Sequence, residues 1–109
     1  MSPIPADNLG RRRFQLQKEK AVEDAMDKIR RTLGPAWYEF SDDEGDSLRE
    51  ILGEIWIAVE RSRWNRYSFT RLKKPDVSSL IAAGNEIRNG DATIDQVSGY
   101  LDSVLGLPE

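Results

Sequence analysis

The residues best able to do chemistry lie in one segment, RSRWNRYSFTRLKK, which spans residues 61–74. This segment holds six basic residues, three aromatic residues and no acidic residue. Basic side chains pair with phosphates or carboxylates, and aromatic rings stack on bases or fill an apolar pocket of a partner. The chemistry that the segment predicts is therefore binding. We call it the basic–aromatic strip, and the residues predicted to bind a partner are Arg61, Arg63, Trp64, Arg66, Tyr67, Arg71, Lys73 and Lys74.

Three interpretations of this strip remain open from the sequence. In the first, the arginines are the solvated end of a helix, and Trp64, Tyr67 and Phe69 belong to the core. In the second, the arginines pair with phosphates while a ring stacks on a base, although no helix-turn-helix, zinc-finger or ribonucleoprotein signature accompanies them. In the third, the strip docks on an acidic protein surface, because arginine, tryptophan and tyrosine are enriched in interfaces.

Charge is strongly segregated along the chain. The net charge is −3, but residues 39–60 contain eight acidic residues and one basic residue, whereas the strip carries only positive charge. The acidic surface could therefore belong to a second copy of the chain. A further basic cluster, Arg11, Arg12 and Arg13, lies near the start of a predicted helix, where positive charge opposes the helix dipole. This cluster is either a solvated helix start or a second set of phosphate contacts.

Most catalytic and metal chemistry lacks the side chains that it needs. The chain has no cysteine and no histidine, which excludes disulfides, thiolate metal sites and histidine-assisted nucleophiles. No glycine-rich phosphate loop is present. The acidic residues 42–46 do not match a calcium loop, because a loop that starts at Asp42 puts Ser47 where glycine is needed and Gly53 where glutamate is needed. We therefore expect no catalytic residue, cofactor, metal or small-molecule substrate. A hydrolase that uses carboxylates alone is the remaining enzymatic alternative.

Size and composition indicate one helical domain. The chain has 109 residues, of which 39% are hydrophobic and 32% are charged, and this length suits a single compact domain. We predict a flexible tail over residues 1–7 and a single helical domain over residues 8–109. No apolar run approaches the length of about 18 residues that spans a membrane, and the N-terminus has no apolar signal region. We therefore expect no membrane contact and a cytoplasmic location.

The first predicted helix ends at Leu33, because Gly34 and Pro35 follow and together form a standard stop signal. Its second half has an apolar stripe, whereas its first half is largely polar and should project past the core or fray. Three aromatic residues after the stop should pin the connection onto the core: Trp37, Tyr38 and Phe40.

The remaining helices follow from capping signals and apolar stripes. A second long helix should begin near Ser47, and it is apolar most of the way round in its middle, as expected of a central helix. A third helix should begin at Asp76 or Ser78, and a last helix should run from Thr93 to about Leu105. The last two helices should form a hairpin with a short connection.

These elements predict an all-α fold, a small bundle of four to five helices, with a short β-hairpin near residues 64–71 as an alternative. We expect a non-enzymatic macromolecular interaction module, an adaptor, inhibitor or assembly factor, that docks on a protein partner through the basic–aromatic strip. The alternative is a small nucleic-acid-binding regulatory protein that uses the same strip together with the N-terminal arginine cluster.

Overall fold

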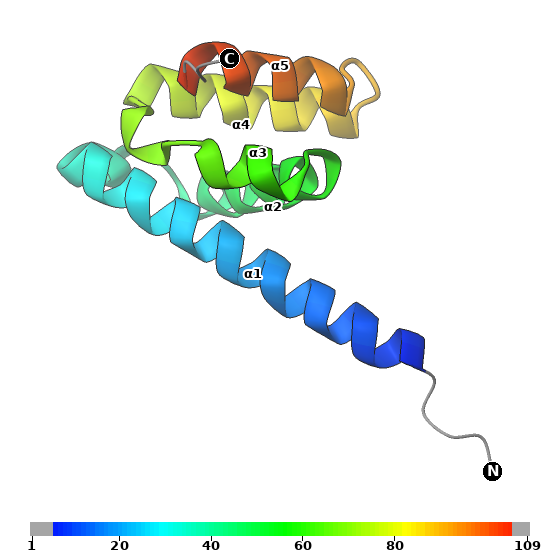
Figure 1. Cartoon of the computed structure of the whole chain (residues 1–109). Helices are drawn as coiled ribbons and strands as arrows, with labels where there is room; N and C mark the ends of the chain where they lie inside the picture. Colours follow the sequence, from blue (N-terminus) through cyan, green and yellow to red (C-terminus); the bar gives the residue numbers. More distant parts are fainter. Residues whose placement is uncertain (1–5, 106–109) are drawn as a thin grey trace.

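The computed structural model describes residues 6–105, which form five α-helices and two short 3-10 helices (Figure 1). The elements are α1 (Ala6–Leu33), η1 (Gly34–Glu39), α2 (Asp42–Ala58), α3 (Arg61–Arg66), η2 (Phe69–Arg71), α4 (Lys74–Arg88) and α5 (Ile94–Leu105). The prediction of an all-α bundle is therefore confirmed. The alternative of a β-hairpin near residues 64–71 is wrong, because this segment holds the end of α3 and the whole of η2, and no residue between 6 and 105 is in a strand.

The long helix α1 has two halves with different surroundings. Its second half packs against the core through Val22, Ala25, Met26 and Ile29, all of which are buried. Its first half extends beyond the other helices as an arm (Figure 1). We define the α1 arm as residues 10–20, none of which is buried. At 1.5 Å of rise per residue the whole helix is about 42 Å long. The predicted projection of the first half is confirmed.

The ends of α1 compare closely with the prediction. The helix ends at Leu33 as expected, and Gly34 then adopts a φ of +56°, a left-handed conformation that glycine accepts without strain. At the other end α1 begins at Ala6, so the last two residues of the predicted tail are helical. The rest of the predicted tail, residues 1–5, lies outside the described residues.

The central helix α2 begins earlier than the predicted start near Ser47. Ser41 is the N-cap, because its hydroxyl accepts from the Glu44 backbone N–H at 3.1 Å while the Glu44 carboxylate accepts from the Ser41 backbone N–H at 3.1 Å. This reciprocal capping box closes one and a half turns before Ser47, and three acidic residues in the first turn suit the positive end of the helix dipole. Ser47 therefore lies inside the helix.

The core gathers around α2, which packs against α1, α4 and α5. Leu48, Leu52 and Ile55 are fully buried on this helix. The contact with α4 is close because Gly84 has no side chain, and a Cβ atom placed there would lie 3.2 Å from the Cβ of Ile51. Buried hydrophobic residues from α1, α3, η2, α4 and α5 complete the core. None of the described helices is both long and apolar enough to cross a membrane.

Helices α4 and α5 form the predicted hairpin (Figure 1). The start of α4 at Lys74 precedes the predicted start at Asp76 or Ser78. The reason is that Asp76 sits in the first turn, where its carboxylate accepts from the backbone N–H of Lys73 at 3.0 Å. The predicted capping box before α5 is present, since Thr93 and Gln96 each accept from the other's backbone N–H.

Candidate functional site

The three rings of the basic–aromatic strip lie in the core. Trp64, Tyr67 and Phe69 have exposed fractions of 6%, 4% and 2%. They pack on one another, with ring centroids 4.9 Å apart for Trp64 and Phe69 and 5.9 Å apart for Tyr67 and Phe69. Tilted contacts of this kind are favourable beyond the apolar area that they bury. The rings therefore hold α3 and η2 against α1 and α5, and they offer a partner almost no surface.

Arg63 is neutralised within the chain. Its guanidinium forms an ion pair with Asp102 of α5, and its Nε donates to Asp102 Oδ1 at 3.2 Å. The Tyr67 hydroxyl donates to the same oxygen at 2.6 Å. Burial raises the pKa of Tyr67 above its ordinary value, and the nearby charge of Arg63 and a hydrogen bond with it oppose this shift. The three side chains thus form one network that joins α3 and its C-cap residue Tyr67 to α5.

Other cations of the strip also have partners. Arg71 donates to the backbone carbonyl of Leu105 at 2.9 Å, and Lys74 forms an ion pair with Glu39 at 2.7 Å. Arg66 is not free either. Arg61 and Lys73 are exposed and have neither an ion pair nor a side-chain hydrogen bond to a described residue. The eight predicted partner-binding residues are therefore not one continuous outward surface.

Arg61 instead faces a groove between α1 and α3. The groove has a volume of about 310 Å³ and receives Lys20 and Lys28 from α1 and Arg61 from α3, with Trp56 and Trp64 among its apolar walls. Its volume is at the lower end of the range of ligand pockets, about 300–1,000 Å³. We call it the α1–α3 groove.

The electrostatics of the α1–α3 groove favour an anion. Lys20, Lys28 and Arg61 are all exposed, and none of them has an ion pair with a residue between 6 and 105. Asp24 is the one carboxylate among the lining side chains. Cations on two facing walls repel one another, and an anion bound between them would relieve this repulsion. The groove can therefore hold a carboxylate or a phosphate by charge.

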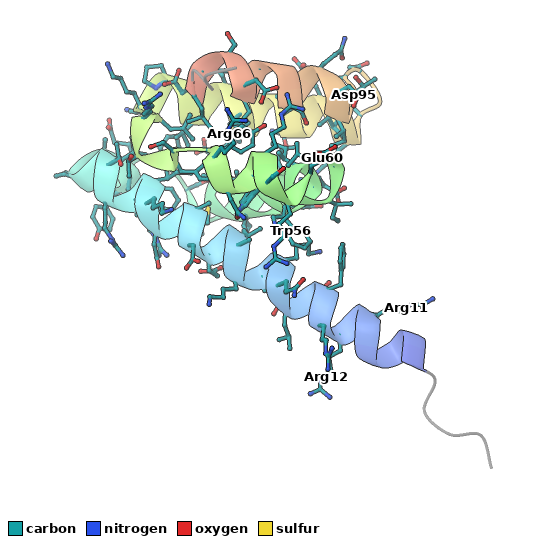
Figure 2. The ribbon with its side chains drawn as sticks, viewed as in Figure 1. Arg11, Arg12, Trp56, Glu60, Arg66 and Asp95 are labelled. Carbon is teal, nitrogen blue, oxygen red and sulfur yellow. The ribbon has the colours of Figure 1, made fainter. Side chains whose placement is uncertain are left out.

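An apolar patch adjoins the groove where the α1 arm leaves the core. Phe14 of the arm packs on Trp56 of α2, with ring centroids 5.0 Å apart. Phe14 is 45% exposed, and the neighbouring Ile57 is 48% exposed. Figure 2 shows Trp56 on the side of the core that faces α1 and shows Arg11 and Arg12 farther out along the arm. The patch adds large apolar side chains to a cationic surface.

The arginine cluster of the arm keeps its predicted exposure. Arg11, Arg12 and Arg13 are all exposed, and no carboxylate of the described chain forms an ion pair with them. They lie on the projecting arm and not beside the buried rings of the strip. The structure thus joins this cluster to the lysines of α1 along one helix, while most of the strip serves the fold.

Sequence reasoning missed Lys20, Lys28 and Trp56 as site residues. Lys20, Asp24 and Lys28 recur every four residues, which places them on one side of a helix. The sequence therefore already indicated the α1 side of the groove. Their position opposite Arg61 depends on the packing of α3 and η2 against α1, and no local pattern encodes that contact. Trp56 has the spacing of a core residue, but it is only partly buried.

No second kind of chemistry emerges from the described residues. They contain no group of three or more side chains placed to hold a metal ion. The acidic residues Asp42, Asp43 and Glu44 are exposed in the first turn of α2, where they stabilise the helix start. Comparisons of the chain with models of protein families, with curated proteins and with solved structures found no match.

Proposed function

We propose that the protein is a non-enzymatic interaction module, an adaptor, inhibitor or assembly factor, that binds an acidic protein surface through the α1–α3 groove. The observation that carries this proposal is that Lys28 of α1 and Arg61 of α3 line the same groove, which Trp56 also lines, and have no carboxylate partners in the described chain. Arginine and tryptophan are the residues most often found at the energetic centre of protein interfaces. The docking surface thus differs from the predicted one, and three of the eight predicted residues line the groove: Arg61, Trp64 and Tyr67.

A protein partner suits this surface better than a nucleic acid. The chain is acidic overall, so a long polyanion would meet repulsion outside the α1–α3 groove. The apolar patch of Phe14, Trp56 and Ile57 gives a protein partner something to bury that a phosphate backbone would leave exposed. The chain also has no cysteine, which agrees with the proposed cytoplasmic location.

One observation favours a second candidate, a small nucleic-acid-binding regulator. The unpaired cations run from the arginine cluster of the arm to Lys20, Lys28 and Arg61 in the groove, and Trp56 provides a ring for stacking. A single strand could follow such a track. Salt separates the two candidates, because affinity for nucleic acid falls steeply with salt in proportion to the phosphates neutralised.

The test compares two double variants with the same loss of charge. Lys28→Gln with Arg61→Gln removes one cation from each wall of the groove, whereas Arg31→Gln with Lys73→Gln removes two exposed, unpaired cations elsewhere. Partners are captured with the unaltered chain from lysate with and without nuclease treatment, purified and measured by calorimetry. We expect the groove variant to bind about tenfold more weakly, a change of about 1.4 kcal/mol, and the control variant to bind normally. Equal affinity for both variants, or a captured partner that is a nucleic acid, would overturn the proposal.

A further inference from the structure

A second surface lies at the other end of the molecule, beside η1. Trp37, Tyr38 and Phe40 line a notch of about 430 Å³ whose lining also includes Met26. Tyr38 is 86% exposed, so the prediction that this residue pins the connection onto the core is wrong. Trp37 and Phe40 do pack against the core as predicted, and they pack on each other with centroids 5.9 Å apart, whereas the Tyr38 ring is left exposed. We call this surface the η1 notch.

The charges around the η1 notch leave it open to a cation. Arg30 and Arg49 line it, but Arg30 pairs with Asp27, and Arg49 pairs with Glu23 and Asp46. Asp42 also lines the notch, is exposed and has no ion pair with a residue between 6 and 105. A guanidinium can bind a carboxylate and also lie over an aromatic face. The notch therefore suits a cationic segment that carries an apolar side chain.

The outward face of the α1 arm is a segment of that kind. Arg12, Arg13 and Leu16 are three and four residues apart, which places them on one side of the helix. Leu16 is 58% exposed, and all three side chains lack an ion pair or a buried contact in the described chain. Phe14 packs on Trp56 at the opposite side of the helix, so this outward face is separate from the apolar patch beside the groove.

The arm and the notch of one chain cannot meet. Both are held by the same continuous helix, and Leu16 and Leu33 are separated by about 26 Å at 1.5 Å per residue. Figure 1 shows the arm pointing away from the end of the molecule where α1 passes into η1. The occupant of the notch therefore has to come from another molecule.

We propose that the outward face of the α1 arm in one copy docks in the η1 notch of a second copy. Leu16 meets the rings of Tyr38 and Trp37, while Arg12 and Arg13 face the carboxylate of Asp42. A contact between two arms is disfavoured, because residues 10–20 contain five basic residues and one acidic residue, and two such segments repel. The surface differs from the α1–α3 groove, so the inference does not depend on the acidic partner proposed above.

Docking between two different patches has a consequence for assembly. After the first contact one copy keeps its notch and the other keeps its arm, so the contact either forms a second time within a reciprocal pair or repeats into open chains and larger rings. The contact has one apolar anchor and a few charge pairs, which places it among small and weak interfaces. We therefore expect reversible association that grows with protein concentration.

The test uses two variants that each keep one half of the contact. The arm variant, Arg12→Gln with Arg13→Gln and Leu16→Gln, retains the notch, and the notch variant, Tyr38→Ser with Asp42→Asn, retains the arm. Sedimentation velocity over a concentration series should show the unaltered chain associating into a dimer or a larger assembly, and each variant alone should stay monomeric. An equimolar mixture of the two variants should form a heterodimer and nothing larger. Circular dichroism and melting confirm that both variants fold.

Several results would overturn the inference. These are an unaltered chain that stays monomeric, a variant that associates by itself, and a mixture that stays monomeric. The groove variant, Lys28→Gln with Arg61→Gln, is the matched control and should associate like the unaltered chain. If this control no longer binds the acidic partner but still associates with itself, the two surfaces act separately. Either proposal can then fail without the other.

Discussion

Asp102 is the residue whose role the sequence hid most completely. It lies 39 positions from Arg63 and 35 from Tyr67, yet it accepts hydrogen bonds from both. A basic side chain followed by aromatic residues is typical of a contact surface, and nothing local shows that a distant carboxylate neutralises it. The exposure of the strip could therefore not be predicted, because a long-range ion pair depends on how α5 packs against α3.

We predict that Asp102→Ala destabilises the fold through this network. The substitution leaves the Tyr67 hydroxyl without its acceptor and Arg63 without its partner, and an unsatisfied buried group costs about 1–3 kcal/mol. Asp95→Ala on the same helix is the control, since Asp95 is exposed and forms no ion pair in the described chain. Urea unfolding measures the free energy of unfolding of each variant. Equal free energies of unfolding for the two variants would contradict the network's role.

Tyr67 also makes stability depend on alkaline pH. Burial raises the pKa of its phenol in the folded state above the ordinary value of 10.0. Above that value the unfolded chain loses the proton while the folded chain still holds it, so the free energy of unfolding falls as pH rises through the folded pKa. We expect Tyr67→Phe, measured by urea unfolding across this range, to lose part of this decline. An unchanged slope would show that Tyr67 does not titrate differently on folding.

At the scale of elements, two capping signals lie close together where α2 begins, and the sequence alone does not show which one starts the helix. The sequence offers Ser41 with Glu44 and Ser47 with Glu50, and the structure uses the first pair. Both obey the same local rule, so the choice depends on where tertiary packing lets the helix start. The helix stop at Gly34, by contrast, is a local signal, and it was predicted to the residue.

The capping choice gives a matched pair of substitutions. Ser41→Ala removes an N-cap and should lower the free energy of unfolding by about 1 kcal/mol. Ser47→Ala lies inside α2 and should leave stability unchanged or slightly higher, because alanine favours helices. Denaturant unfolding of both variants checks this. A larger loss for Ser47→Ala would mean that α2 starts at the later signal.

A second matched pair of substitutions, at Gly84 and Gly99, tests the close contact between α2 and α4. Alanine at either position improves helix propensity by about 1 kcal/mol. At Gly84 the added methyl would lie 3.2 Å from the buried Ile51, whereas nothing lies within 4 Å at Gly99. We expect Gly99→Ala to raise the free energy of unfolding. The free energy of unfolding of Gly84→Ala should be at least about 1 kcal/mol lower than that of Gly99→Ala. Equal gains would mean that the two helices are not in close contact at Gly84.

At the scale of the whole molecule, charge and exposed rings are distributed between two ends of an elongated chain. Most of the exposed cations without an ion pair in the described chain lie along α1 and at Arg61, and the notch with Tyr38 lies where α1 ends (Figure 1). The sequence did predict a segregated cationic surface, but the fold uses most of the strip as internal structure and leaves the recognition chemistry to α1.

The three tryptophans give a direct test of where an acidic partner binds, because Trp56 and Trp64 line the α1–α3 groove and Trp37 lies at the η1 notch. The measurement is a nuclear magnetic resonance titration of the ¹⁵N-labelled full chain with poly-glutamate at fixed salt. We expect the indole N–H signal of Trp56 and the amide signals around Lys28 and Arg61 to move most, and the indole signal of Trp37 to stay in place. Shifts confined to residues 71–74, or no shift at all, would contradict the account.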